Sequence, residues 1–351
     1  MPADVTQWIL ISAGSGLVLS ALATWVALAY ARRHGMLDQP GKRRSHQVPT
    51  PRGGGVGIVV ATLLAGLPAA WSLSDHASAD RVYVAFGVGV LAVALIGWRD
   101  DRAPLAVMPR LLVHLGAAVL VGAAILAPVA AHNPWLWWLL LPLAPVLVGF
   151  INAHNFMDGI DGILGQQGLF VMLGLGVLAL WLGESGIAAL AFAVAAGCLG
   201  FLAFNAPPAK IFMGDVGSGA LGLSLGAVAA LVVQQNPAML WACAILPSAF
   251  LVDSGLTLAR RMLARQRWYA PHRQHLYQWL VRVNWSHART DIAYLLWNLV
   301  VVAPLAWLAA ISPAHGAACF ALAYAAAAAV WFAGKRACLA AARGGRLHEP
   351  A

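Results

Sequence analysis

Residues 135–183 read WLWWLLLPLAPVLVGFI, then NAHNFMDGIDG, then ILGQQ and GLFVMLGLGVLALWLG: a polar stretch, Asn152–Gly162, enclosed by apolar runs. The flanking runs, 135–151 and 168–183, approach the roughly 20 apolar residues that a helix needs to cross a bilayer. Long apolar runs separated by short polar stretches continue along the rest of the chain. This pattern predicts membrane-spanning helices with the polar chemistry confined to their connections.

The composition agrees with this prediction. Of the 351 residues, 61% are hydrophobic and 10% are charged, whereas a soluble chain carries about 25% charged residues. We therefore predict an all-α polytopic membrane protein that forms a single integral membrane domain over residues 1–351. About eleven spans are expected, at 8–30, 54–73, 82–98, 111–131, 135–151, 168–183, 187–204, 217–235, 238–259, 291–311 and 315–334.

The positive charges predict the orientation. With these spans, 21 of the 22 Lys and Arg residues fall on one set of alternate loops or on the C-terminal tail, and Arg81 falls on the other side. By the positive-inside rule the N-terminus is outside and the C-terminus is cytoplasmic. The main cytoplasmic loops are then 31–53, 99–110, 152–167, 205–216 and 260–290. The net charge of +9 is explained by topology and by attraction to anionic headgroups, so nucleic acid is not expected as a partner.

Two further features narrow the class of protein. The four cysteines are scattered singly through apolar sequence without a C-x-x-C motif, which indicates buried thiols rather than a zinc site or a disulfide framework. The first apolar run follows Asp4 and is too long for the apolar part of a cleaved signal peptide.

Four polar side chains recur at every third position of the central polar stretch: Asn152, Asn155, Asp158 and Asp161. If this stretch is helical, they share one face. Amide and carboxylate oxygens suit a divalent cation such as Mg²⁺ and a phosphate-bearing substrate. The alternative is a helix N-terminus with capping acids.

Two more loops carry acids in a setting that suits a metal. Asp100 and Asp101 are adjacent carboxylates flanked by arginines, which favours metal binding or acid–base work over a solvated turn. Asp215 stands among glycines where a predicted span begins, as in compact metal–phosphate sites. The alternative there is an ordinary N-cap aspartate.

Two basic loops suit an anionic ligand. Lys42 and Arg52 precede the glycines 53–55, an arrangement that suits phosphate as well as an ordinary basic loop. His272, Arg273 and His275 lie together in the longest loop. Without a nearby cysteine or third histidine they favour phosphate or sugar binding over zinc, with a basic surface helix as the alternative.

One acid, Asp253, lies inside a predicted span near its cytoplasmic end. An ionisable residue within the membrane is a functional candidate. A polar contact between helices explains it equally well, so both interpretations stay open.

The order of these motifs resembles the polyprenyl-phosphate N-acetylhexosamine-1-phosphate transferases. It runs P-T-P-R-G-G-G at 49–55, D-D-R at 100–102, N-A-H-N-F-M-D-G-I-D-G at 152–162, N-A-P-P-A-K-I-F-M-G-D-V-G-S at 205–218 and H-R-Q-H at 272–275. The resemblance implies transfer of an N-acetylamino-sugar 1-phosphate from a UDP-sugar to undecaprenyl phosphate, with release of UMP, at the cytoplasmic face of a bacterial inner membrane. It implies Mg²⁺, or alternatively Mn²⁺, as cofactor.

The resemblance also implies roles for individual residues. Asn155 and Asp215 would hold the metal. Asp100 and Asp101 would position the lipid phosphate or act as base, and Asp158 and Asp161 would support the metal or the nucleotide. The nucleotide itself would contact Asn152, Asn205 and Phe212, the last by stacking on uracil. Phosphates and sugar would contact Lys42, Arg52, His272, Arg273 and His275.

The branch of the family is less determined. Asp101 is followed by R-A-P-L, and the last large loop has H-R-Q-H rather than consecutive histidines. These departures favour the branch that initiates O-antigen or other cell-envelope polysaccharides over the muramoyl-pentapeptide transferases, which remain the alternative. A rival of another class is a transporter for an anionic solute, which should carry ionisable groups near the bilayer midplane. The identity of the sugar and a homodimeric state are left open.

Overall fold

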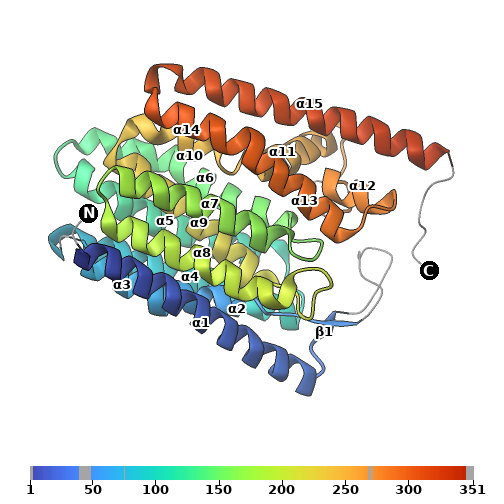
Figure 1. The fold of residues 1–351 in the computed structure, drawn as a ribbon, viewed down its shortest axis with the longest axis horizontal. Helices are drawn as coiled ribbons and strands as arrows, with labels where there is room; N and C mark the ends of the chain where they lie inside the picture. The colour runs from blue at the N-terminus through green and yellow to red at the C-terminus, as the bar shows by residue number, and fades with distance from the viewer. Residues whose placement is uncertain (1–2, 39–48, 75, 268–269, 271, 345–351) are drawn as a thin grey trace.

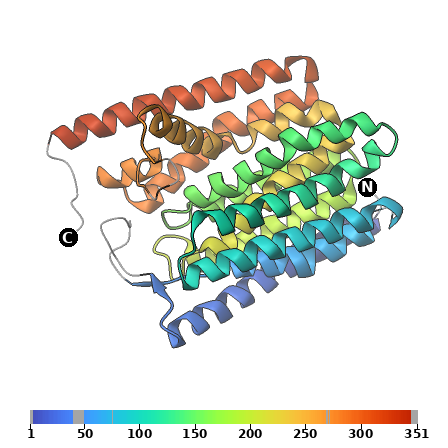
Figure 2. The ribbon, with the colours of Figure 1, turned by 180° about the vertical axis from the view of Figure 1, so that it is seen from behind.

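The chain folds into a bundle of long helices. The computed structural model describes residues 3–38, 49–74, 76–267, 270 and 272–344, and Figures 1 and 2 show the helices running alongside one another. The elements are α1 (Ala3–Arg33), β1 (Leu37–Asp38), β2 (Thr50–Pro51), α2 (Val56–Ala61), η1 (Thr62–Gly66), α3 (Leu67–Ser72), α4 (His76–Arg102), α5 (Val107–Ala130), η2 (Pro134–Leu139), α6 (Leu140–Phe156), α7 (Ile163–Trp181), α8 (Ser185–Asn205), α9 (Asp215–Gln235), η3 (Pro237–Met239), α10 (Leu240–Ile245), α11 (Ser248–Leu263), α12 (Leu276–Arg282), α13 (His287–Trp297), η4 (Asn298–Val302), α14 (Ala303–Ile311), η5 (Pro313–His315) and α15 (Gly316–Arg343).

The helical, multi-pass character predicted from the sequence is confirmed, although the number eleven is not. Within the described residues, nine helices are long and apolar enough to cross a membrane, and a bent pair raises the number to ten. That pair, Pro237–Ile245 and Ser248–Leu263, turns by 71° at Pro247, which lacks the N–H that would continue the helix. The predicted span 54–73 appears as the shorter apolar helix Val56–Ser72. The four cysteines are free and buried, as expected.

Helix α9 lies at the centre of the bundle. In its most apolar window 89% of the residues are buried, and it packs against α4 and α6 through small side chains. Gly222 allows α9 to approach α6 closely, because a Cβ there would lie 2.7 Å from the carbonyl oxygen of Phe150 on α6. Small residues allow this close packing between helices that share no aqueous driving force.

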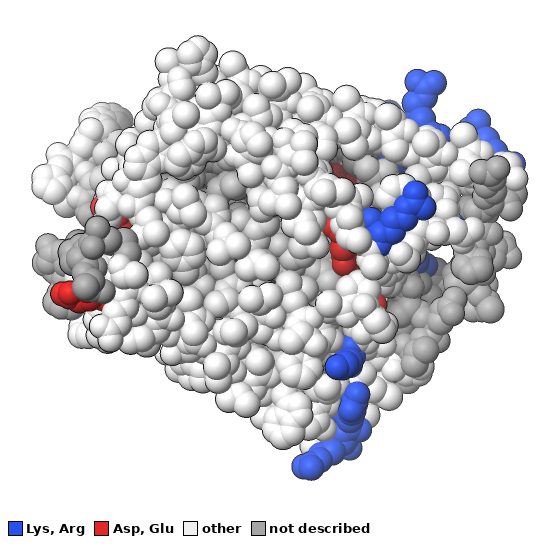
Figure 3. All heavy atoms as spheres, in the orientation of Figure 1, with Lys and Arg blue, Asp and Glu red and all other residues white. Residues whose placement is uncertain are grey.

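Basic side chains and the loops that carry the predicted site residues lie at one end of the bundle. On the face seen in Figure 3, the Lys and Arg side chains gather at the right-hand end, where α1 and α15 end. The N-terminus lies at the opposite end (Figure 1). The connections α4–α5, α6–α7 and α8–α9 all meet at the basic end, so the loops predicted to carry the chemistry come together there.

Asp253 on α11 holds the helices at this end together. Its oxygens accept hydrogen bonds from the backbone N–H of Leu276 at 2.8 Å, from the Tyr294 hydroxyl at 2.9 Å and from Trp331 Nε1 at 3.0 Å. These partners belong to α12, α13 and α15. The contacts support the interpretation of Asp253 as a helix–helix polar contact.

Gly222→Ala tests the packing of α9. The added Cβ would press on backbone atoms of α6 that cannot rotate away, and such overpacking costs about 1–3 kcal/mol. We expect a lower melting temperature in detergent. Gly116→Ala on α5 is the control, since nothing lies within 4 Å of its Cβ position. Equal melting temperatures for the two variants would contradict the close packing.

Candidate active site

The N-terminus of α9 is fixed by a buried carboxylate. Asp101, whose side chain is 1% exposed, accepts the backbone N–H groups of Asp215 and Val216 at 3.0 and 3.1 Å. Gly214 makes this possible, since it has a φ of +75° and a Cβ there would lie 2.5 Å from Asp101 Oδ2. A carboxylate that satisfies free N–H groups at a helix start also interacts favourably with the helix dipole.

Two arginines link this carboxylate to its neighbours. Arg52 contacts Asp101 Oδ1 through Nε and Asp215 Oδ1 through Nη2, both at 2.9 Å. Arg110 contacts Asp100 Oδ2 at 2.7 Å and Asp215 Oδ2 at 3.1 Å. Each oxygen of Asp215 therefore faces one guanidinium group. The network joins the loop before α2, the α4–α5 connection and the start of α9.

A cavity of about 650 Å³ opens beside this network. Its wall combines carboxylates, basic groups, two phenylalanines and amides: Asp158, Asp161, Asp215, Arg52, Arg110, His272, His275, His287, Phe156, Phe212, Asn155 and Asn205 all line it. Burial, and to a smaller extent the neighbouring carboxylates, raise the pKa of Asp158 to about 7 although Arg52 opposes the shift. The cavity therefore favours an additional positive charge near Asp158.

The four-residue polar edge predicted for the central stretch is divided in the structure. Helix α6 ends at Phe156, so Asn152 and Asn155 are helical while Asp158 and Asp161 lie in the loop before α7. Asn155 lines the cavity and donates from Nδ2 to Ser218 Oγ at 2.9 Å, which leaves its carbonyl oxygen for a ligand. Asn152 instead donates to Val148 O within α6 and is not among the residues that line the cavity.

Asp161 and Asn205 join the loops that form the wall. Asp161 Oδ2 accepts the N–H of Ala209 at 3.0 Å and lies 3.2 Å from His287 Nδ1. Asn205 is 4% exposed, and its side chain accepts the N–H of Gly162 at 2.9 Å and donates to Ile211 O at 2.9 Å. Both polar ends of this amide are used within the protein, so its contact with uracil stays a prediction.

Phe212 lies in a loop that pairs with the basic loop before α2. Its N–H donates to Pro51 O at 2.8 Å, and its carbonyl accepts the N–H groups of Gly53 and Gly54. Its ring lines the cavity next to Arg52. The structure thus brings these two predicted ligand residues together. Lys42, predicted to bind phosphate, lies outside the described residues.

The histidine motif is divided between two cavities. His272 and His275 line the cavity, whereas Arg273 lines a neighbouring pocket that also includes His272. The ring centres of the two histidines are 5.0 Å apart. Burial, and then the positive charges nearby, lower the pKa of His272 to about 4. A neutral imidazole at physiological pH can donate a hydrogen bond to a phosphate oxygen without adding charge.

Several residues that line the cavity were not predicted from the sequence, Arg110 and His287 among them. Arg110 was noted only as a topological charge, and His287 was not singled out. Arg110 stands ten residues after Asp100, across the turn between α4 and α5. In the sequence, Pro104 suggests a turn between Asp100 and Arg110, and that turn was the one sign that these two side chains would face each other.

The residues present fit a magnesium ion that is shared with a substrate. Among the described residues, no three His, Cys, Asp or Glu side chains gather as a metal site on their own. Mg²⁺ is commonly held by one or two carboxylates together with substrate phosphates and water. Asp215 and Asn155 line the cavity, and burial raises the pKa of Asp158 to about 7, so a nearby cation would stabilise its ionised carboxylate. That donor set suits Mg²⁺ or Mn²⁺ once phosphates complete it.

Fold and site together define a polytopic membrane protein with a polar cavity at one end of its helix bundle. Comparison with known proteins places it in a family. The model described as Glycosyl transferase family 4 matches residues 83–233. A decaprenyl-phosphate N-acetylglucosaminephosphotransferase of Mycolicibacterium smegmatis is 33% identical over 79% of this chain and 77% of its own length. The chain belongs to this family of glycosyl transferases.

Other relatives show where the resemblance is less specific. A probable undecaprenyl-phosphate N-acetylglucosaminyl 1-phosphate transferase of Bacillus subtilis is 29% identical over 80% of this chain and 79% of its own length. A phospho-N-acetylmuramoyl-pentapeptide-transferase of Moorella thermoacetica is 36% identical over 63% of this chain and 76% of its own length. The predicted family is confirmed, whereas the O-antigen-initiating branch is not.

Asp158 and Asp101 should respond in opposite ways to neutralisation. Because the pKa of Asp158 is raised to about 7 in the folded protein, this group costs stability increasingly as pH rises from about 4 to about 7. Asp158→Asn should therefore raise the melting temperature of the metal-free protein at pH 8, with a smaller gain at pH 5.

Asp101→Asn is the matched comparison. Burial raises the pKa of Asp101 as well, but this carboxylate accepts two N–H groups and one guanidinium, and an amide has only one acceptor oxygen for them. Asp101→Asn should therefore lower the melting temperature at pH 8 by the loss of these hydrogen bonds. Thermal unfolding in detergent with EDTA measures both variants. A destabilised Asp158→Asn, or an unaffected Asp101→Asn, would contradict the assigned electrostatics.

Proposed function

We propose that this protein transfers an N-acetylamino-sugar 1-phosphate from a UDP-sugar to a polyprenyl phosphate, such as undecaprenyl phosphate, in the bacterial inner membrane. The observation that carries the proposal is the cavity in which carboxylates, cationic groups and Phe212 face one another at the basic end of the bundle. The relatives named above act, by their names, on a polyprenyl phosphate or a muramoyl-pentapeptide. The positive-inside rule supports a cytoplasmic position for this cavity.

The proposed reaction is one phosphoryl transfer. An oxygen of the polyprenyl phosphate forms a bond to the β-phosphorus of the UDP-sugar. The bond between that phosphorus and the oxygen bridging to UMP breaks, so UMP leaves and a lipid-pyrophosphoryl-sugar forms. A dedicated base is not required, since a phosphate monoester with a second pKa near 6 is largely dianionic at neutral pH.

The residues of the cavity have distinct proposed roles. Phe212 stacks on uracil, while Asp215 and Asn155 hold the divalent cation, whose contribution is to neutralise the pyrophosphate charge. His272 and His275 hydrogen-bond the pyrophosphate or the sugar. Asp101, with both oxygens already occupied, positions Asp215.

The remaining polar groups of the cavity orient the ligand-binding residues named above or the acceptor phosphate. Arg52 is already paired with two carboxylates, so an incoming anion would meet a guanidinium oriented by the protein. Asp100, held by Arg110, lies on the same network and is proposed to position the acceptor phosphate through that arginine. Asp161 keeps the wall closed by its contacts with Ala209 and His287.

The donor sugar separates two candidate functions. An N-acetylhexosamine donor, for O-antigen or another envelope polysaccharide, is supported by the N-acetylglucosaminyl relatives and by the H-R-Q-H motif. A muramoyl-pentapeptide donor is favoured by the relative of highest identity among those named. A transporter is disfavoured because Asp253, the acid discussed above as lying inside a predicted span, uses its oxygens for structural hydrogen bonds.

UMP release by the purified protein tests the proposal. The assay combines undecaprenyl phosphate and Mg²⁺ with UDP-GlcNAc, UDP-GalNAc, UDP-FucNAc, UDP-QuiNAc or UDP-MurNAc-pentapeptide. We expect release with an N-acetylhexosamine donor that stops without the lipid or with EDTA. Release with the pentapeptide donor alone would identify the second candidate. No release with any donor, where a characterised relative is active, would contradict the proposal.

Asp215→Asn tests the site within this assay. Loss of the charged ligand should lower the turnover rate roughly 100-fold or more, as for other groups that stabilise charge in a transition state. Asp80→Asn is the control. Asp80 lies near the start of α4, away from the cavity, and its carboxylate accepts a hydrogen bond from Trp71 Nε1. Wild-type turnover by Asp215→Asn in Mg²⁺ would remove the metal assignment.

A further inference from the structure

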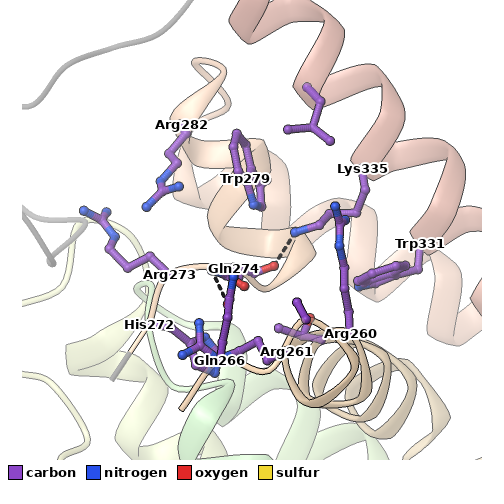
Figure 4. A pocket seen from close by; sticks show the side chains of 13 residues that line it. Arg260, Arg261, Gln266, His272, Arg273, Gln274, Trp279, Arg282, Trp331 and Lys335 are labelled. Atoms are coloured by element: carbon purple, nitrogen blue, oxygen red, sulfur yellow. Dashed lines mark hydrogen bonds between the residues drawn. The ribbon is translucent and has the colours of Figure 1, made fainter. Parts of the chain in front are cut away.

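A second cavity, of about 590 Å³, lies beside the first, and His272 is the one described residue that lines both. Helices α11, α12 and α15 and the connection before α12 form it, and Figure 4 shows side chains from all of them turned toward one space. None of the reaction chemistry proposed above uses this space. We call it the basic pocket, lined by Thr257, Arg260, Arg261, Ala264, Gln266, His272, Arg273, Gln274, Trp279, Arg282, Trp331, Lys335 and Leu339.

The basic pocket is positively charged without a matching acid. Four arginines and one lysine line it, and none of the described lining residues is an aspartate or glutamate. Asp253 lies on α11 but already accepts hydrogen bonds from Leu276, Tyr294 and Trp331. An anionic ligand is the partner that this arrangement lacks.

Two of the cationic side chains that line the basic pocket, Arg261 and Lys335, are buried. Arg261 is 7% exposed; its Nη2 donates to Arg267 O at 2.7 Å, while its Nε is buried without a hydrogen-bond partner among the described residues. Lys335 is 5% exposed, and Nζ donates to the carbonyl of Gln274 and lies 5.2 and 5.4 Å from the ring centres of Trp279 and Trp331. Asp253 is the carboxylate that attracts Lys335, but it is one acid beside the five cationic side chains that line the pocket. Buried charge that is not fully balanced is costly, and a bound anion would relieve that cost.

The helices that form the basic pocket carry exposed apolar side chains on their outer faces. Met262 and Leu263 follow Arg261 on α11, and Phe332 follows Trp331 on α15; they are 58%, 86% and 56% exposed and do not line the pocket itself. In a multi-pass membrane protein such side chains face lipid. Basic pockets between helices at the positive side of a membrane protein suit anionic headgroups, and tryptophans favour the same depth.

We propose that the basic pocket binds the phosphate headgroup of an anionic phospholipid whose acyl chains lie against the exposed apolar residues of α11 and α15. Free phosphate offers the same anionic chemistry, but it has no apolar part to cover Leu263 and Phe332. A polyprenyl phosphate also has an apolar tail, but its phosphate has to reach the first cavity, on the other side of His272, in order to react.

Native mass spectrometry of the intact protein in detergent tests this proposal. The probes are dioleoylphosphatidylglycerol, dioleoylphosphatidylcholine, undecaprenyl phosphate and inorganic phosphate, each at equal concentration. The variant is Arg260→Gln with Arg282→Gln, two lining residues that are not fully buried. Arg336→Gln is the matched control, because Arg336 follows Lys335, is exposed and does not line the pocket.

We expect the wild type and Arg336→Gln to retain phosphatidylglycerol over phosphatidylcholine. The double variant should retain about tenfold less, since each cation near a headgroup contributes to lipid attraction. Equal retention by double variant and wild type would overturn the proposal, as would retention of undecaprenyl or inorganic phosphate in place of phosphatidylglycerol.

The double variant Arg260→Lys with Arg282→Lys distinguishes loss of charge from misfolding. This variant keeps both charges, so it should restore most of the phosphatidylglycerol retention if the glutamine variant lost charge rather than structure. A lysine variant as deficient as the glutamine variant, with an unchanged melting temperature, would overturn the charge-based assignment. These measurements need no turnover, so their result is separate from that of the transferase assay.

Discussion

The hydrogen bonds between Asp101 and the first N–H groups of α9 are the interaction on which the site depends. They place a carboxylate from the end of α4 at the start of the most central helix. Arg52 then joins the same carboxylate to Asp215. Without this cap, the start of α9 would have unsatisfied N–H groups, and Asp215 would lose the support that orients it toward the cavity.

The apolar bundle and the polar site constrain each other. Close packing at Gly222 fixes α9 against α6, and thereby fixes Asn155 near Ser218 at the end of the two helices. Burial at that end, with a smaller contribution from the neighbouring acids, raises the pKa of Asp158 to about 7. The protein therefore holds charges together at a cost that a cation and a phosphate-bearing ligand would offset. Asp253 supports the other side of the cavity by joining α11 to the helix that follows the histidine motif.

The sequence was most informative where chemistry and periodicity coincide. The apolar runs predicted helices because no soluble fold could bury them, and the acids beside glycines predicted Asp158 and Asp215 as cavity residues. Asn152 and Asn205 show the limit: an amide in a motif can serve the ligand or the backbone, and only three-dimensional contacts distinguish the two. Arg110 and Arg273 show the same limit for charges, whose partners depend on how loops distant in sequence meet. The number of spans was uncertain because a 17-residue helix and a helix broken at Pro247 have the composition of spans but not their regular length.

A structure of the protein with UDP-GlcNAc and Mg²⁺, determined by electron cryomicroscopy, tests the central claim most directly. We expect uracil against Phe212 and the pyrophosphate between Asp215 and His272, with the α9 N-terminus still capped by Asp101. Nucleotide density in the basic pocket, or pyrophosphate away from Asp215, would contradict it.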